Sequence, residues 1–354
     1  MSKLICPSGI WCFFLFILSV PAMSMEAKVK EEAFFNQEFP SAIVPGKIVF
    51  QSNRDGALSE IWIFENGKIR KIASDKKTDK NIPKQLPSSM AGMLGGAFGK
   101  LNDPKWSPDG KNILCLNSGK MIMLGEDENT PKKIETAKYV HSAVWSSLGG
   151  AVYYSAIDWL ATGGACNIYK LNLNDKTERK ITNIPPAPGV TSILSFTVSS
   201  DDKKIAMAIV GDNDISIWTI NTDGSDFKML IKYACEPAWS PDGTKIVYSS
   251  SVLPNGEKIP NQRNKIFVFD LETGKTTQIT QKDWEDRNPI FSPDGTKIAF
   301  VSYRHRVITH GSEIFVINVD GTGEARLTPS QKNPKYPNDM FRGWSTDQYP
   351  DWHA

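Results

Sequence analysis

The sequence has little histidine, little cysteine and almost no net charge. Its 354 residues include 4 His and 5 Cys, and 41 basic against 39 acidic side chains give a formal net charge of +2. A chain so close to neutral lacks the basic footprint of a nucleic-acid-binding protein. It also contains no His-Glu-x-x-His zinc motif, no P-loop, no Cys-x-x-Cys pair and no Gly-x-Ser-x-Gly nucleophile elbow. We therefore expect no cofactor, no catalytic residue and no nucleic-acid partner.

Long apolar runs are also missing, except at the N-terminus. Residues 10–20 are apolar, follow Lys3, and precede Ala22 and Ser24, two small residues at the spacing that a signal peptidase needs. The run is too short for a comfortable membrane span. We expect a cleaved secretory signal peptide over residues 1–24, a periplasmic or secreted protein, and no membrane span after cleavage. Retention of the segment as an anchor is the alternative.

What the sequence does contain is a repeated turn. The tetrapeptide Ser-Pro-Asp-Gly follows a Pro-x-aromatic step at 104–110, 237–243 and 289–295, and an apolar run follows each copy. Pro presets φ, Asp bonds the local backbone and Gly accepts positive φ, so each copy predicts a tight turn between antiparallel strands. Looser copies lie at 145–149 and 198–202.

The repeat has six units. The first apolar residues of the runs are Ile48, Ile113, Val152, Ile205, Ile246 and Ile298. Each run is followed by a second run of β-branched and aromatic residues, a polar turn in most units, and a short last strand. Each unit is thus a four-stranded antiparallel meander, and radial repetition of such sheets gives a β-propeller. We predict an all-β, six-bladed propeller over residues 46–354, preceded by an extension at 25–45.

The two ends of this region complement each other. The first unit begins at Gly46 without a Pro-x-aromatic strand, whereas the chain ends at 349–354 with a Pro-x-Trp strand that no turn follows. We predict that residues 350–354 form the inner strand of the first blade and remove an open sheet edge. The inner strands are then marked by Trp106, Trp145, Val198, Trp239, Phe291 and Trp352.

These motifs resemble the TolB-type (WD40-like) propeller repeat over about residues 46–354. The resemblance rests on Pro-x-Trp-Ser-Pro-Asp-Gly-x-x-Ile, on Ser-Asn-Arg-Asp-Gly at 52–56 and on Asp-Gly before Arg-Leu-Thr within 320–328. In TolB the propeller binds a peptidoglycan-associated lipoprotein and follows a separate α/β domain. Because only 25–45 lie between the predicted cleavage site and the first strand, we expect that domain to be missing. The resemblance implies a monomeric, non-catalytic module for an envelope protein or peptide.

A carbohydrate-active enzyme is the alternative function. Related propellers occur in prolyl-oligopeptidase-like peptidases, which need a hydrolase domain with the missing nucleophile elbow, and in oligogalacturonate lyase. The lyase resemblance implies a metal at the channel mouth that several histidines hold. The sequence has four: His141, His305, His310 and His353.

Loop lengths indicate which face of the propeller carries the binding site. Connections from second to third strand, and from one blade to the next, emerge on one face and include the long segments, and such loops often carry binding residues. Arg304, His305 and His310 form a basic, titratable loop there, and Trp284 and Trp344 are candidate contact anchors. Alternatively, Arg304 pairs with a nearby carboxylate and both tryptophans pack between blades. The spacing of His305 and His310 fits no standard metal signature, so we predict no metal.

A second candidate site lies at the channel mouth. The position three residues before each inner-strand marker carries a hydrogen-bonding side chain: Asp103, Ser142, Ser195, Glu236, Asn288 and Tyr349. With two acids and no base, this ring favours a cationic group, with Asp103 and Glu236 as binding residues. A hydrated channel is the alternative.

Overall fold

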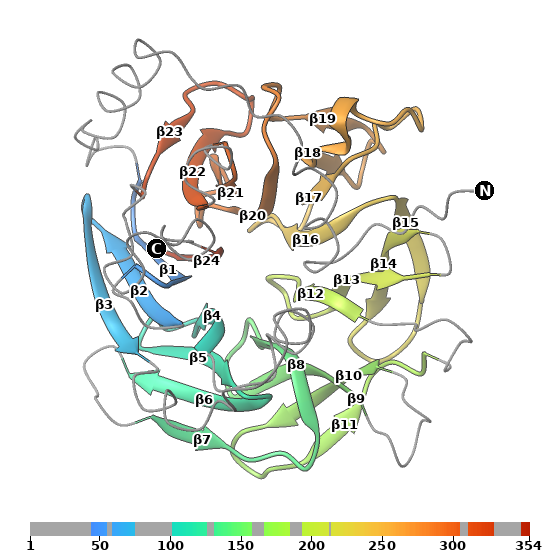
Figure 1. Cartoon of the computed structure of the whole chain (residues 1–354). Helices are drawn as coiled ribbons and strands as arrows, with labels where there is room; N and C mark the ends of the chain where they lie inside the picture. Colours follow the sequence, from blue (N-terminus) through green and yellow to red (C-terminus); the bar gives the residue numbers. More distant parts are fainter. Residues whose placement is uncertain are drawn as a thin grey trace, which may run out of the picture.

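The computed structural model describes residues 44–54, 59–74, 101–125, 131–157, 166–184, 193–211, 214–304, 311–328 and 348–354. The described residues form six sheets of four antiparallel strands each. The sheets are arranged radially as the blades of a propeller (Figure 1). Within these ranges no helix has the length and apolarity to cross a bilayer. The predicted signal peptide lies outside the described residues.

The first three blades, each with its strands in order from the channel outward, form one half of the ring. Blade 1 consists of β24 (Gln348–His353), β1 (Lys47–Ser52), β2 (Glu60–Glu65) and β3 (Lys68–Ser74). Blade 2 consists of β4 (Leu101–Trp106), β5 (Asn112–Asn117), β6 (Lys120–Gly125) and β7 (Lys132–Ile134). Blade 3 consists of β8 (Tyr139–Trp145), β9 (Ala151–Ile157), β10 (Cys166–Asn172) and β11 (Glu178–Lys180).

The other half of the ring is built in the same way. Blade 4 consists of β12 (Ile193–Val198), β13 (Lys204–Val210), β14 (Ile215–Asn221) and β15 (Lys228–Lys232). Blade 5 consists of β16 (Cys235–Trp239), β17 (Lys245–Ser250), β18 (Lys265–Asp270) and β19 (Thr276–Gln278). Blade 6 consists of β20 (Asp286–Phe291), β21 (Lys297–Ser302), β22 (Glu313–Asn318) and β23 (Ala325–Arg326).

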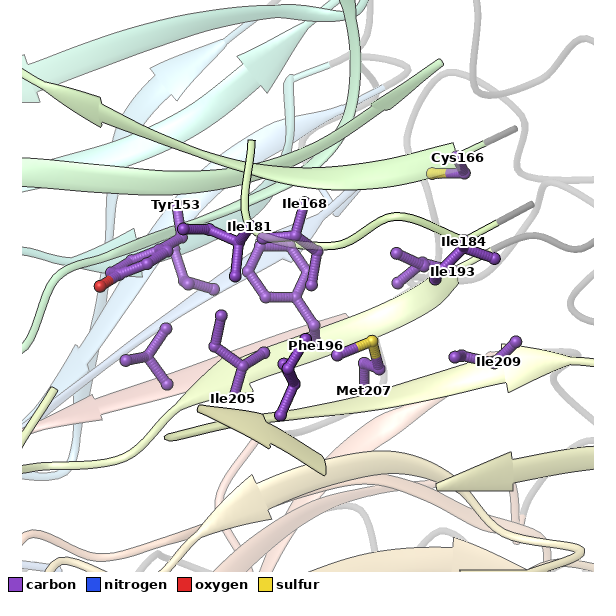
Figure 2. Close-up of a cluster of buried hydrophobic side chains, with 13 residues drawn as sticks. Tyr153, Cys166, Ile168, Ile181, Ile184, Ile193, Phe196, Ile205, Met207 and Ile209 are labelled. Carbon is purple, nitrogen blue, oxygen red and sulfur yellow. The ribbon is translucent and has the colours of Figure 1, made fainter. Parts of the chain in front are cut away.

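The hydrophobic core lies between blades rather than within any one of them. Figure 2 shows the cluster between blades 3 and 4, where Tyr153 and Ile168 face Phe196, Ile205 and Met207. Four of these five side chains have no exposed surface, and Phe196 is 5% exposed. Since burying one such side chain stabilises the fold by about 2 kcal/mol, stacking of neighbouring blades holds the ring together.

The C-terminal strand closes the ring as the sequence predicts. β24 pairs antiparallel with β1, placing Trp352 opposite Ile48 and His353 opposite Lys47. The Trp352 ring is buried between blades 1 and 6, and its indole nitrogen donates a hydrogen bond to the carbonyl of Pro45 at 2.8 Å. The strand begins at Gln348, slightly earlier than predicted, because a bulge lets Gln348 pair with Gln51.

The Ser-Pro-Asp-Gly turns have the predicted geometry. In the first copy, Gly110 has φ 66° and its N–H donates to the carbonyl of Ser107 at 2.9 Å. The Ser107 hydroxyl donates to the Asp109 carboxylate at 2.5 Å and accepts the N–H of Asn112 at 2.9 Å. The same serine-to-aspartate bond recurs in blade 5, where it lowers the pKa of Asp242 to about 2. Repetition of one local hydrogen-bond set thus fixes the repeated turn.

One looser copy of the turn has a structural reason for its missing glycine. Asp202 takes the glycine position with φ 59°, and its N–H donates to the carbonyl of Ser199. Its buried carboxylate accepts bonds from the N–H of Ser147 at 3.1 Å, the hydroxyl of Tyr153 at 3.0 Å and the ammonium of Lys170 at 2.9 Å. A side chain in place of glycine therefore ties blade 4 to blade 3.

Candidate functional site

The propeller has two unlike faces. The turns between first and second strands lie on one face, which we call the turn face, and the connections that lead into each inner strand lie on the other, the loop face. Residues 251–264 and 281–285 are described loop-face connections. Three predicted site residues, His305, His310 and Trp344, lie outside the described residues.

Three inner strands carry a bulge at the position three residues before the marker, which we call the mouth position. In β4, β16 and β20 the register shifts there, and Asp103, Glu236 and Asn288 have φ of 51°, 57° and 50°. A non-glycine residue in this region is strained and persists only where its surroundings hold it. Bulges change the direction in which side chains point. The contacts of these three residues therefore show which groups the bulges bring together.

The first network spans blades 1 to 3 and contains Asp103, Lys105, Ser142 and Asp351. Asp103 accepts a hydrogen bond at 2.7 Å from the hydroxyl of Ser142, the mouth residue of the next blade, and pairs with the Lys105 ammonium at 2.8 Å. Asp351, on β24, accepts the N–H of Trp106 at 2.7 Å. These contacts connect three inner strands across the channel wall.

The electrostatics of the first network are those of one base between two acids. Burial alone lowers the pKa of Lys105, but the carboxylates of Asp103 and Asp351 outweigh it, so the net pKa is raised. Burial raises the pKa of Asp351 to about 6, against the opposing effects of Lys105 and the Trp106 N–H. Asp351 is therefore the group of this network that titrates in a mildly acidic range.

The second network spans blades 5 and 6 and contains Glu236, Ser249, Glu285, Arg287 and the backbone of Asn288. Glu236 accepts hydrogen bonds from the Ser249 hydroxyl at 2.7 Å and from the Asn288 N–H at 2.8 Å. Arg287 pairs with Glu285 at 2.6 Å and lies 3.9 Å from Glu236. Burial opposes the charge of Arg287, but the two carboxylates outweigh it and raise its pKa.

Both mouth acids therefore already have a basic partner. The predicted ring counted one position per blade, whereas Lys105 lies two residues after its mouth position and Arg287 one residue before its own. Because the strand bulges, residues on either side of the mouth position reach the same acids. The cation that the ring favours is supplied at Asp103 and Glu236 by the protein itself.

Arg304 lies in a buried ion pair. Its guanidinium donates to both carboxylate oxygens of Glu324, at 2.8 and 3.3 Å, and its Nε donates to the Ser302 hydroxyl at 2.9 Å. The same group lies 3.6 Å from the centroid of the Phe315 ring. This is the carboxylate pairing that the sequence offered as an alternative to a binding role. Arg304 acts within blade 6.

Trp284 lies on a loop that its neighbours hold firmly. Its side chain is half-buried, and we call residues 281–285 the Trp284 platform. The buried Lys265 ammonium donates to the carbonyls of Lys282 and Trp284, at 2.7 and 2.5 Å, and burial lowers its pKa. Arg263 pairs with Asp283 at 3.2 Å. The platform joins the second network, because Glu285 is the acid that Arg287 contacts.

Tyr139 and His141 form an aromatic pair that was not predicted from the sequence. Both are exposed at the start of β8, with ring centroids 5.4 Å apart in an edge-to-face arrangement. Desolvation lowers the pKa of His141. They precede the mouth residue Ser142, so position in the repeat was an available signal, but His141 was considered only as a metal ligand. Within the described ranges, no three His, Cys, Asp or Glu side chains are grouped to hold a metal.

Comparisons with known proteins agree with the fold. The TolB β-propeller domain model (PD40) matches residues 189–346. An uncharacterised protein of Agrobacterium fabrum is 26% identical over 259 residues, covering 70% of this chain and 80% of that protein. The Tol-Pal system protein TolB of Francisella tularensis is 32% identical over 92 residues, which cover 26% of this chain and only 19% of TolB.

Solved structures extend the similarity to most of the chain. A structure from Agrobacterium tumefaciens assigned as TolB has a TM-score of 0.58 at 19% identity and covers 87% of this chain and 99% of that one. An oligogalacturonate lyase in complex with manganese has a TM-score of 0.51 at 15% identity, covering 79% and 73%. At these identities the structures show the fold alone. The closed ring makes the chain a six-bladed β-propeller, and its residues 189–346 match the TolB β-propeller domain.

Proposed function

We propose that this propeller is a non-catalytic module that binds an envelope protein or peptide on its loop face. The observation that carries the proposal is the Trp284 platform, which holds a half-buried tryptophan beside the charged second network. Large aromatic side chains are the usual anchors of protein contacts. A loop that is already ordered loses little entropy when a partner binds.

The charges at the mouth support a peptide as the ligand class. Arg287 has two acidic neighbours, and Glu285 extends the network towards Trp284. A paired cluster of this kind orients polar backbone and side-chain groups more readily than it activates a nucleophile. Across the mouth, Tyr139 and His141 supply a second aromatic surface. The similarity to TolB and the predicted signal peptide favour a partner in the periplasm or outside the cell.

The experiment is a calorimetric titration of the mature protein with a purified peptidoglycan-associated lipoprotein. Trp284→Ala and Tyr139→Ala alter the loop face, and Leu148→Ser, at a side chain 77% exposed on the turn face, is the matched control. We expect Trp284→Ala to weaken binding about 30-fold, the loss of about 2 kcal/mol typical of an anchor. Equal affinities for all three variants would contradict the proposal.

The lyase alternative is decided by metal analysis of the same purified protein. Stoichiometric divalent metal that is lost in a His305→Ala, His310→Ala double variant, together with cleavage of oligogalacturonate, would replace the binding function by an enzymatic one. The binding proposal expects neither result.

A further inference from the structure

Exposed apolar side chains concentrate at the outer edge of blade 4. Among the described residues, six large hydrophobic side chains are exposed, and three of them lie within 227–233: Phe227 at 46%, Met229 at 43% and Tyr233 at 47%. The other three are scattered over blades 3 and 6. Single exposed apolar residues are normal, but a group within one short segment marks an interaction surface.

Met229 lies on β15, and Phe227 and Tyr233 flank the two ends of this strand. β15 pairs with β14 on one side and is the last strand of its sheet as described, at the rim of the ring (Figure 1). The outermost strands of blades 2, 3 and 5 have three residues and that of blade 6 has two, whereas β15 has five. β3 is longer, but its apolar residues are half-buried. Among the described outermost strands, β15 alone combines length with an exposed large apolar side chain, Met229.

The apolar side chains of the edge are held in place from behind. Phe227 stacks on Trp218 with ring centroids 4.8 Å apart, and Met229 pairs with Trp218 across the strands. A bulge at Leu230 places Ile231 opposite Ile217 instead of continuing the alternation. The surface is therefore ordered before any partner arrives, which lowers the entropy lost on binding.

The charges at the two ends of β15 decide which partner fits. Lys228 and Lys232 are exposed, and the contact of Lys228 with Asp226 at 2.8 Å is an exposed pair that contributes little. A second copy that paired antiparallel about Leu230 would set Lys228 against Lys232. Like charges directly opposite destabilise a strand pair, so the edge disfavours its own copy. Because of the bulge, Lys228 and Lys232 pair with Thr219 and Ser216, which are three positions apart on β14, so the two lysines lie on opposite faces of the sheet. A regular strand with acidic residues three positions apart is complementary to both.

We propose that the outer edge of β15 is a docking edge for an extended peptide segment that carries two acidic side chains three positions apart with apolar residues between them. Such a segment adds a fifth strand to blade 4, where backbone hydrogen bonds supply affinity and the side chains supply specificity. The acids face Lys228 and Lys232, and an apolar residue covers Met229. This site lies on the rim, apart from the loop face, and goes beyond the proposed function.

The test uses a short synthetic peptide of alternating valine and threonine with two glutamates three positions apart. A second peptide has lysines in place of the glutamates, and a third has N-methyl groups on alternate backbone nitrogens. The full chain is labelled at the methionine methyl groups, so that the Met229 resonance reports on this edge. We expect the glutamate peptide to shift that resonance and to bind about tenfold more tightly than the lysine peptide. N-methylation should abolish binding.

A charge exchange distinguishes strand docking from nonspecific hydrophobic binding. The double variant Lys228→Glu, Lys232→Glu should reverse the preference between the two peptides, whereas Lys132→Glu, Lys133→Glu on the edge strand β7 should preserve it. Exposed changes of this kind cost little stability, and thermal melting verifies that both variants fold. Trp284→Ala should leave peptide binding unchanged, which separates this site from the loop face.

Several results would overturn the proposal. They are an unshifted Met229 resonance at millimolar peptide, equal binding of both peptides, or indifference to N-methylation. Dimerisation that the charge exchange abolishes would assign the edge to a second copy. Binding only to phosphatidylglycerol vesicles would assign it to a membrane.

Discussion

The two networks at the channel mouth use the same repeat position for the acid but different positions for the base. Asp103 pairs with Lys105, which follows it on its own strand. Glu236 lies near Arg287, which comes from the next blade. Both acids also accept a hydrogen bond from the mouth residue of the next blade, through the Ser142 hydroxyl in one case and the Asn288 backbone in the other.

This difference shows which property the repeat fixes. The bulge and its positive φ aim the mouth side chain at the neighbouring blade, so the bond between blades recurs. The compensating base has no fixed place. The first network also contains Asp351, whereas the corresponding positions in blades 5 and 6 are the apolar Ala238 and Ile290. At this position of the repeat, the closure strand thus adds a half-buried acid to the first network.

The largest effect is expected from deleting residues 350–354, which removes Asp351 from the first network and opens the ring. Replacing a buried Trp by Ala costs about 3–5 kcal/mol, a large part of the stability of a typical domain, and the deletion also exposes the edge of β1. We expect a far lower Tm, which calorimetry measures, or aggregation, which gel filtration detects. Equal Tm values for the two chains would show that β24 does not close the ring.

The next effect separates the two mouth acids. Glu236→Ala leaves the Arg287 charge with one acid and removes the acceptor for the Asn288 N–H and the Ser249 hydroxyl, so we expect a loss of about 2–4 kcal/mol. Asp103→Ala leaves Lys105 near Asp351, and we expect about 1–2 kcal/mol. Urea unfolding of both variants measures the difference. Equal losses would mean that Asp351 does not compensate for Asp103.

A smaller effect is the pH dependence of the free energy of unfolding that Asp351 of the first network causes. The pKa of Asp351 is raised to about 6 in the fold, above the ordinary value of 3.8, so its favourable contribution is complete below about 3.8 and is lost as the pH rises through about 6. Asp351→Asn should therefore be about 1 kcal/mol more stable than the native chain at pH 8. This advantage should vanish near pH 4.

The turn acid Asp242 provides a control of opposite sign. Its pKa is lowered to about 2 by the Ser240 hydroxyl, so it stabilises the fold above about 3.8 and loses this contribution as the pH falls through about 2. Asp242→Asn should thus be less stable than the native chain at neutral pH. Parallel pH profiles for Asp351→Asn and Asp242→Asn would refute the assignment of Asp351 as a burial-shifted acid.

The smallest effect tests the backbone of the second network. Asn288 contributes its N–H to Glu236 and has φ 50°, a region that glycine enters without strain. Asn288→Gly should preserve the bond and change the free energy of unfolding by no more than about 0.5 kcal/mol. A loss comparable to that of Glu236→Ala would show that the Asn288 side chain, rather than its backbone, holds the two blades together.

Some site residues could be anticipated from the sequence and others could not. The strand pattern predicts that Trp284 lies in a connection on the loop face, and the structure places it there, between β19 and β20; its binding role is a proposal. Arg304 was found on the same ground, yet its contacts with Glu324 and Phe315 belong to blade 6. The sequence left open whether Arg304 binds a partner or pairs with a carboxylate. Only the fold distinguishes the two, because it brings Glu324, in the turn before β23, next to Arg304 just after the end of β21.

By itself the sequence determined the number of blades, the turns and the closure of the ring. These features follow from local hydrogen-bond patterns that recur at similar spacing, such as the Ser107 turn, and from two chain ends that are complementary. The tertiary structure alone decided which charges meet at the channel mouth. The N–H of Trp106 and the carboxylate of Asp351 are 245 positions apart in the chain. Their contact exists because bulged inner strands turn side chains across the seams between blades, a direction that strand alternation does not encode.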